Sequence, residues 1–263
     1  MSSLDIRDRS REALVLKSSP YKEQDRLLTL LSPEQGLERA IARGAAKANG
    51  SLRPIAQPYT QVSLLLSPAK GGISFVREGT PLRCLLPLDA GLERFAYGAY
   101  CAELALSVAQ PEQPAPGVYA LLLAAWTLLQ LDDDLERAAR FFELRLLADQ
   151  GLLPDLHCCG ECGLAISGQR SFLLSPESGQ LLCGNCLEAL GGDPMLPRLS
   201  PGSVRSAQSL LELPLSRVPS LSISRSVNRE LSQALAIYLD HHLEYAPKAR
   251  NLLQQLSSIN NNY

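Results

Sequence analysis

The first eighty residues alternate short apolar runs with polar turn residues. The runs are EALVLK, DRLLTLLS, LERAIARG, QVSLLLS and GISFVRE, at residues 12–17, 25–32, 37–44, 61–67 and 72–78. Turn residues separate them at Ser18–Ser19–Pro20, Ser32–Pro33 and Gly71–Gly72. Five short strands at this spacing favour a small β-barrel, because closing the sheet removes its exposed edges. An OB barrel is the natural candidate, with an SH3-like barrel or a small sandwich as alternatives.

After Pro87 the pattern changes to helical spacing. Residues 92–109 are rich in helix formers, and apolar residues recur at helical spacing over 118–129. Between these two segments the chain is interrupted by three prolines: Pro111, Pro114 and Pro116. Two separate helices are therefore expected here, and their apolar faces must bury against other parts of the chain.

Two further helices are expected later in the chain. Asp133 with Glu136 predicts a capping box that opens a helix, and Gly151 ends it. A last apolar stripe runs over about residues 225–245 and stops before Pro247. Between these helices lies a cysteine-rich segment with little helical periodicity.

These patterns together predict an α+β chain. A small OB-type barrel is expected over residues 1–82, followed by a helical domain formed by residues 83–154 and 191–263. A four-cysteine zinc module over residues 155–190 is expected to interrupt that helical domain.

Composition favours a protein of the cytoplasm. The 263 residues are 46% hydrophobic, which is ordinary for a soluble chain. The amino-terminal MSSLDIRDRSRE alternates charges where a secretory signal needs an apolar run. The longest apolar stretches would extend only about 21 Å as helices, short of the ~30 Å membrane interior. Seven cysteines, an odd number, fit metal ligation in a reducing compartment better than a disulfide framework.

The cysteines form two short pairs with metal-ligand spacing. Cys159 and Cys162 are separated by two residues, as are Cys183 and Cys186, and twenty residues lie between the pairs. This spacing is typical of a four-cysteine zinc site, and Gly160, Gly163 and Gly184 allow tight turns around the ion. Cys158 or His157 could replace one ligand, but Cys159 makes both pairs two-residue loops.

Four thiolates leave no open coordination position, so the expected ion is a single structural Zn²⁺. It would let a segment of about 35 residues fold despite its small core. The module is a poor candidate for DNA contact, because Arg170 is its only basic residue and it carries four acidic ones: Asp155, Glu161, Glu177 and Glu188.

Positive charge gathers in the first third of the chain. Residues 1–81 hold 12 Lys and Arg against 8 Asp and Glu, although the formal net charge of the whole chain is −2. The segment LERAIARGAAKANGSLRP contains a single acid, Glu38. Its basic residues and those of the neighbouring strands are the candidate DNA-binding set: Lys17, Lys22, Arg26, Arg39, Arg43, Lys47 and Arg53. The alternative is an ordinary solvated barrel face.

Catalytic patterns are scarce. The chain has three histidines and lacks a P-loop, a G-x-S-x-G elbow and an H-E-x-x-H helix. The run Asp132–Asp133–Asp134 is better explained as a helix cap than as a magnesium site. We therefore expect a binding protein and not an enzyme.

Three stretches resemble the bacterial recombination mediators of the RecO family. They are YKEQDRLLTLLSPEQGLERAIARGA with the following LRPIAQPYTQVSLLL, the cysteine pairs around SPESGQLLCGNC, and the terminal YLDHHLEYAPKARNLL. The first stretch is the most specific, because paired cysteine knuckles occur in many unrelated proteins. The loop GAAKANGS departs from the family pattern by being less basic than expected.

The resemblance implies an OB barrel, a helical domain and a zinc module without catalytic activity. It implies binding to single- and double-stranded DNA, annealing of complementary strands, and loading of RecA onto DNA coated with single-strand binding protein (SSB). It also implies that RecR and the C-terminal tail of SSB are partners, with RecF in some settings, and that the protein is cytoplasmic and nucleoid-associated. Two other hypotheses stay open at this stage: a zinc-containing adaptor that binds only proteins, and a metalloenzyme.

Overall fold

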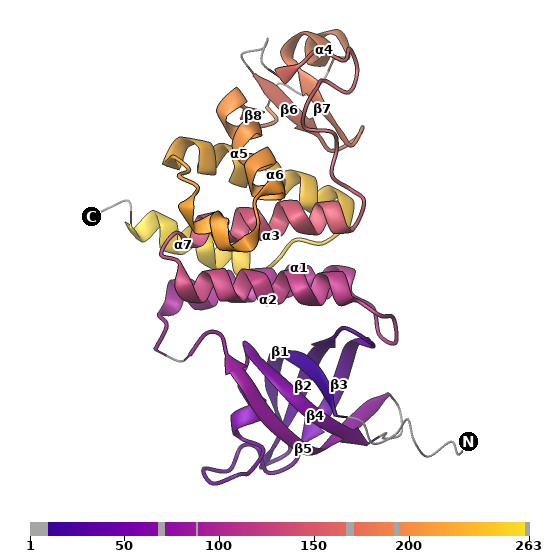
Figure 1. The fold of residues 1–263 in the computed structure, drawn as a ribbon, viewed down its shortest axis with the longest axis vertical. Helices are drawn as coiled ribbons and strands as arrows, with labels where there is room; N and C mark the ends of the chain where they lie inside the picture. Colours follow the sequence, from indigo (N-terminus) through magenta and orange to yellow (C-terminus); the bar gives the residue numbers. More distant parts are fainter. Residues whose placement is uncertain (1–9, 68–71, 88, 167–170, 192–194, 261–263) are drawn as a thin grey trace. The chain divides into compact units, whose positions relative to one another are not determined.

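The computed structural model describes residues 10–67, 72–87, 89–166, 171–191 and 195–260. For residues 257–260 it describes the backbone alone. The chain separates into two compact units. The first unit consists of residues 1–131 with 251–263, and the second unit of residues 132–250. Figure 1 shows the elements of both units in sequence colours. This division does not test the four residue ranges expected from the sequence, and they stay predictions.

The first unit begins with a closed five-stranded barrel. Its strands are β1 (Arg11–Tyr21), β2 (Asp25–Ser32), β3 (Gly36–Ala42), β4 (Thr60–Ser67) and β5 (Ile73–Cys84). Their order around the barrel is β1-β2-β3-β5-β4, with β4 closing onto β1. Only β3 and β5 pair in parallel. This is an OB-type barrel, so the expected fold class is confirmed, and the SH3-like and sandwich alternatives are wrong.

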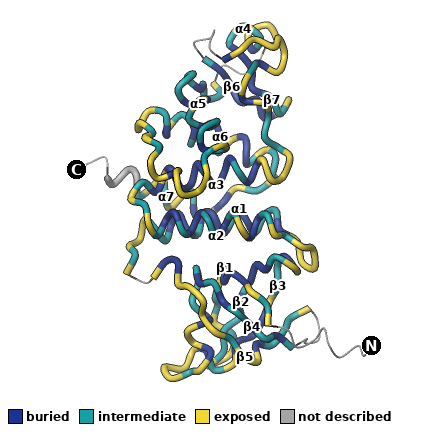
Figure 2. Tube along the Cα trace, in the orientation of Figure 1, coloured by how far each residue is buried: buried dark blue, intermediate teal, exposed yellow. Residues whose placement is uncertain are grey.

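Alternation along the strands fills the barrel interior. Every second residue of β4 is buried. Figure 2 colours the chain by burial. The interior cluster is made of small and medium apolar side chains, among them Val15, Leu28, Leu30, Ala40, Ala42, Val62, Leu64 and Val76. On β2 and β3 the even-numbered residues therefore point inward and the odd-numbered ones outward.

Two long helices complete most of the first unit. They are α1 (Leu92–Val108) and α2 (Pro116–Leu131), and they contact each other. The segment between them lies against the start of β3, where the Leu37 amide donates to the Gln110 carbonyl at 3.1 Å. A Cβ on Gly36 would come within 2.3 Å of that same carbonyl, so this close approach requires glycine.

The second unit is built around α3 (Leu135–Asp149). It packs against both α5 (Pro201–Glu212) and α6 (Arg225–Leu243), which also contact each other. A short 3-10 helix, η3 (Leu215–Ser220), joins α5 to α6. The final helix, α7 (Ala249–Asn260), begins in this unit and continues in the first. In the described parts of the chain, no helix is long and apolar enough to cross a membrane.

The start of α3 corrects one detail of the sequence analysis. The N-cap is Asp134 and not Asp133, and its carboxylate accepts from the Arg137 amide at 2.9 Å. Glu136 does not close a capping box, because its carboxylate accepts instead from the Asn228 side chain of α6. Asp132 pairs with the Arg137 guanidinium at 2.6 Å. The acidic run is thus used as a cap and an ion pair.

The cysteine segment forms a small sheet and a short helix. Strands β6 (Phe172–Ser175) and β7 (Gln180–Cys183) make a hairpin, followed at once by α4 (Gly184–Ala189). A third strand, β8 (Arg198–Leu199), pairs with β6. The sheet therefore includes Arg198 and Leu199, which lie beyond residue 190, the predicted end of the module.

Candidate metal centre and nucleic-acid interface

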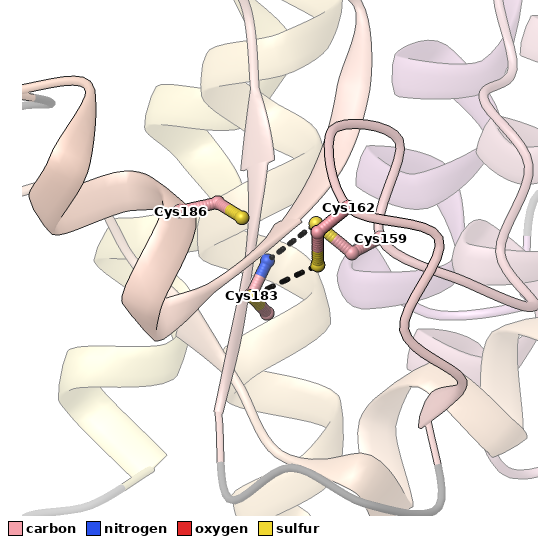
Figure 3. Close-up of side chains that lie close together, drawn as sticks. All are labelled: Cys159, Cys162, Cys183 and Cys186. Carbon is pink, nitrogen blue, oxygen red and sulfur yellow. Dashed lines mark hydrogen bonds between the residues drawn. The ribbon is translucent and has the colours of Figure 1, made fainter.

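Four cysteine sulfurs lie within 4.8 Å of one another, and they belong to Cys159, Cys162, Cys183 and Cys186. Figure 3 shows these side chains converging from a loop, from the end of β7 and from α4. Around a tetrahedral ion with bonds of about 2.3 Å, neighbouring sulfurs would be about 3.8 Å apart. The sulfurs of Cys162 and Cys183 are 3.9 Å apart. The described residues therefore provide a four-sulfur site that can hold a metal ion.

Local backbone geometry brings each pair together. The first pair lies on a tight turn, which the Gly163 amide closes by donating to the Cys159 carbonyl at 2.9 Å. Gly163 has a φ of 70°, which favours glycine at this position. The Gly160 amide ties the turn to β7 by donating to the Leu181 carbonyl at 2.8 Å. The second pair follows from the junction of β7 with α4, where Cys183 is the N-cap.

The surroundings favour the thiolate of Cys159. Burial opposes its ionisation, but backbone amides of Cys162, Cys183 and Glu161 outweigh burial and lower the pKa of the Cys159 thiol to about 6. The Cys183 amide lies 3.3 Å from the Cys159 sulfur. The pKa of Cys186 is raised, chiefly by its contacts with the Cys162 and Cys183 sulfurs. A cation among the four sulfurs would favour the thiolate form of each.

The two alternative ligands point elsewhere. The Cys158 sulfur lies 3.5 Å from an Asp155 carboxylate oxygen, and this hydrogen bond raises the pKa of the Cys158 thiol. The His157 ring nitrogen Nδ1 lies 3.2 Å from the Gln208 amide nitrogen. Neither residue belongs to the four-sulfur cluster.

The cysteine segment carries exposed acidic side chains. Asp155, Glu161, Glu177 and Glu188 are all exposed. Arg170, the expected single basic residue of the module, lies outside the described residues. The acidic exposure makes this surface unfavourable for phosphate groups.

On the barrel, two of the candidate DNA-binding residues share one row across three strands. Thr29 of β2 is opposite Lys17 of β1 on one side and Arg39 of β3 on the other. Both basic side chains are exposed, and all three residues lie on the outward side of the sheet. We call Lys17, Thr29 and Arg39 the cationic row. The surface formed by strands 2 and 3 is the one that OB folds use for oligonucleotides.

The single acid of the basic segment lies on the opposite side of β3. Glu38 pairs in register with the interior residue Leu30. Its carboxylate accepts from the Arg11 guanidinium at 3.0 Å and from the Ser32 hydroxyl at 2.8 Å. Glu38 therefore does not neutralise Arg39, a separation that follows from the two-residue period of a strand.

A second group of basic residues lies on connected turns. The Asp25 carboxylate accepts from the Gly44 amide at 2.8 Å, and the Gln24 carbonyl accepts from the Ala46 amide at 3.0 Å. These bonds join the β1–β2 turn to the loop after β3. Three exposed candidates are carried by the joined segments: Lys22, Arg43 and Lys47.

The remaining two candidates are placed differently. Arg26 is opposite the interior residue Ala42, so it projects on the inward side at the barrel end. Arg53 is exposed and donates to the Ala48 carbonyl at 3.0 Å, which ties the loop to itself. Sequence reasoning missed Arg77, an exposed residue at an irregularity of β5. The sequence feature that could have pointed to Arg77 is its position two residues after the aromatic Phe75, on the same strand.

Two family models match this chain, and together they cover most of its length. A family model described as Recombination protein O N terminal matches residues 7–85. Another, described as Recombination protein O C terminal, matches residues 90–251. The first match covers the barrel, and the second covers most of the helical and cysteine regions.

Several relatives of similar length are named DNA repair protein RecO. A DNA repair protein RecO from Desulforudis audaxviator (strain MP104C) is 35% identical over 245 residues, covering 93% of this chain and 96% of the relative. One from Moorella thermoacetica (strain ATCC 39073 / JCM 9320) is 31% identical over 251 residues, covering 95% and 91%. One from Bacillus subtilis (strain 168) is 26% identical over 248 residues, covering 94% of each chain.

Proposed function

The chain belongs to the RecO family of DNA repair and recombination proteins, and on that premise we propose that it is a DNA-binding and strand-annealing mediator. It binds single- and double-stranded DNA through the OB barrel, anneals complementary strands and helps to load RecA onto SSB-coated DNA. Its protein partners are RecR and the C-terminal tail of SSB, with RecF and RecA engaged indirectly. The proposal contains no catalytic step of the chain's own.

The cationic row is the observation that carries this proposal. Lys17 and Arg39 flank Thr29 on the surface that OB folds use for oligonucleotides, and Glu38 is turned to the other side of β3. Two complementary strands repel each other until their phosphates are neutralised. A positive surface that holds strands by their phosphates lowers this repulsion and leaves the bases free to pair.

The metal in this proposal is one structural Zn²⁺. The observation that supports zinc is the chemistry of the donors, because the group that the described residues form consists of four cysteine sulfurs. Bound there, the ion would link the Cys159–Cys162 turn to β7 and α4. It thus stabilises a small sheet whose own apolar core is limited.

Salt dependence tests the DNA assignment. We expect fluorescence anisotropy with labelled single strands to give a log-log slope of about −0.7 per phosphate contacted, or roughly −2.8 for four contacts. Replacing Arg39, Arg43 and Lys47 by alanine should flatten this slope by about 2, because up to three contacts are lost. The matched control replaces three exposed arginines of the second unit by alanine: Arg205, Arg225 and Arg229. It should leave the slope unchanged.

An adaptor without DNA affinity would give a different result. It would show no binding to oligonucleotides at low salt, and the barrel variant would keep its affinity for RecR. A strand-annealing assay with two complementary labelled oligonucleotides completes the test. The barrel variant should anneal them more slowly than the control variant.

A further inference from the structure

One aromatic ring on the outer surface of the barrel is paired with a candidate DNA-binding arginine. The guanidinium carbon of Arg43 lies 4.3 Å from the centroid of the Phe75 ring, within cation–π distance. Phe75 is half-buried and Arg43 is exposed. Phe75 does not belong to the barrel interior, whereas its neighbour Val76 does. The Phe75 ring therefore lies on the outer side of the barrel.

Strand register places this ring beside the cationic row. Phe75 of β5 is opposite Ile41 of β3, and Ile41 is opposite Leu27 of β2. We call Leu27, Ile41 and Phe75 the apolar row. It lies two residues along the strands from the cationic row, a separation of about 7 Å. Leu27 and Phe75 are half-buried and offer apolar surface beside the cationic row, whereas Ile41 between them is buried.

We propose that the Arg43–Phe75 pair, together with the half-buried Leu27 at the other end of the apolar row, is a stacking platform for unpaired bases of single-stranded DNA. This inference deepens the proposed function and rests on it. The phosphates lie along the cationic row, and the bases turn toward the apolar row. The base nearest β5 stacks on the guanidinium plane of Arg43.

Two chemical properties of the pair support this assignment. Bases in protein complexes stack on aromatic rings and on arginine guanidinium planes. The Arg43 guanidinium lies over the Phe75 ring, a contact that favours one placement of a long side chain. Arg43 is exposed, and a guanidinium can stack with a base through its plane and donate to a phosphate through its N–H groups.

The platform separates single strands from duplexes. In a duplex the bases are paired inside the helix, so a duplex meets only the positive charges of this surface. A single strand gains the stacking contacts in addition. When two bound strands pair, their bases leave the platform and the affinity falls to the phosphate contribution, which favours release of the annealed product.

The test uses three probes of equal length: a single strand containing 2-aminopurine, a strand of abasic sites, and a duplex. The natural protein should bind the abasic strand about five- to hundredfold more weakly than the base-bearing strand. Phe75→Leu and Arg43→Lys, which keep apolar volume or charge, should lower the affinity for the base-bearing strand toward that of the abasic strand. The 2-aminopurine fluorescence change on binding should also diminish.

The other probes provide the controls. Affinity of Phe75→Leu for the abasic strand and for the duplex should change by less than about twofold, because the charge of Arg43 remains. Arg205→Lys, the same substitution as Arg43→Lys at an exposed site on α5, should change none of the three affinities.

Each alternative outcome has a distinct meaning. Equal binding of abasic and base-bearing strands by the natural protein would overturn the platform while the proposed function stands. Equal weakening of all three probes by both variants would also overturn it, because the pair would then act through charge or folding. Failure of the natural protein to bind any probe at low salt would remove the proposed function itself.

Discussion

Two adjacent cysteines have opposite environments although the sequence gives them similar spacing to Cys162. Cys159 is buried and receives a hydrogen bond from the Cys183 amide, whereas Cys158 lies against the Asp155 carboxylate. A nearby carboxylate disfavours a thiolate, and amide donors favour one. The difference arises from the turn that Gly163 closes, which directs the side chain of Cys159 toward Cys162 and Cys183.

Single substitutions should therefore separate the two positions. Cys159→Ser removes a sulfur from the cluster, and we expect the purified variant to lose most of its bound zinc. Cys158→Ser should keep about one zinc per chain, because this side chain lies outside the cluster. Metal content measured by atomic emission after dialysis checks both variants. Loss of zinc from the Cys158 variant alone would place Cys158 among the ligands.

At the scale of elements, a carboxylate of α6 holds the start of α5. Glu230 accepts from the Ser200 amide at 2.8 Å and from the Ser203 hydroxyl at 2.5 Å. Ser200 is also the N-cap of α5, since its hydroxyl accepts from the Ser203 amide. Burial opposes ionisation of Glu230, but the bonds from Ser203 and Ser200 outweigh burial and lower the pKa of its carboxyl.

This lowered pKa predicts a pH-dependent contribution to stability. A carboxyl whose pKa is lower in the folded state stabilises the fold above its ordinary pKa of about 4.3. The contribution is lost as the pH falls through the lowered value. We expect Glu230→Gln to reduce the free energy of unfolding by about 1 kcal/mol at pH 7. The difference from the natural protein should shrink as the pH falls below the ordinary pKa of a glutamate and through the lowered value.

Urea unfolding followed by circular dichroism measures this difference. Glu212→Gln, at an exposed carboxyl in α5, is the matched control and should stay within about 0.5 kcal/mol at every pH. A difference for Glu230→Gln that stays constant with pH would show that charge is not the cause.

At the scale of the whole molecule, the two candidate sites fall in different compact units. The barrel and its cationic row belong to the first unit, and the four cysteines to the second. Charge follows the same division, because the amino-terminal third is basic and the cysteine segment carries four exposed acidic residues. Metal binding and DNA binding should therefore be separable.

Zinc removal tests this separation. A chelator strong enough to remove the ion should lower the thermal stability of the second unit, because metal binding contributes to its folding. Affinity for single-stranded DNA at low salt should change little. Calorimetry and anisotropy on the same sample measure both properties, with zinc added back as the control. A parallel loss of DNA affinity and stability would mean that the metal site supports the DNA surface.

Much of the architecture was predictable from local pattern. The five strands lie close to the expected runs, and the four helices expected from periodicity correspond to α1, α2, α3 and α6. The strands β6, β7 and β8 and the short helices α4 and α5 were not separately predicted. The strands and α4 are too short to show a period, so tertiary contacts decide their form. In α5, by contrast, Val204, Ala207 and Leu210 are buried at helical spacing, a local signal that the sequence analysis did not use.

The candidate sites divide in the same way. The spacing of the cysteines was sufficient to nominate four sulfurs, because a metal knuckle is a local turn. The spacing could not say that Lys17 and Arg39 share a row, that Glu38 faces away from them, or that Arg43 lies over Phe75. Those relations depend on strand register and on a β-bulge in β1 between Val15 and Lys17. The sequence alone determines the candidate metal ligands because residues close together in the chain form the knuckle. Only the tertiary structure determines the barrel surface, because its residues come from strands that are distant in sequence.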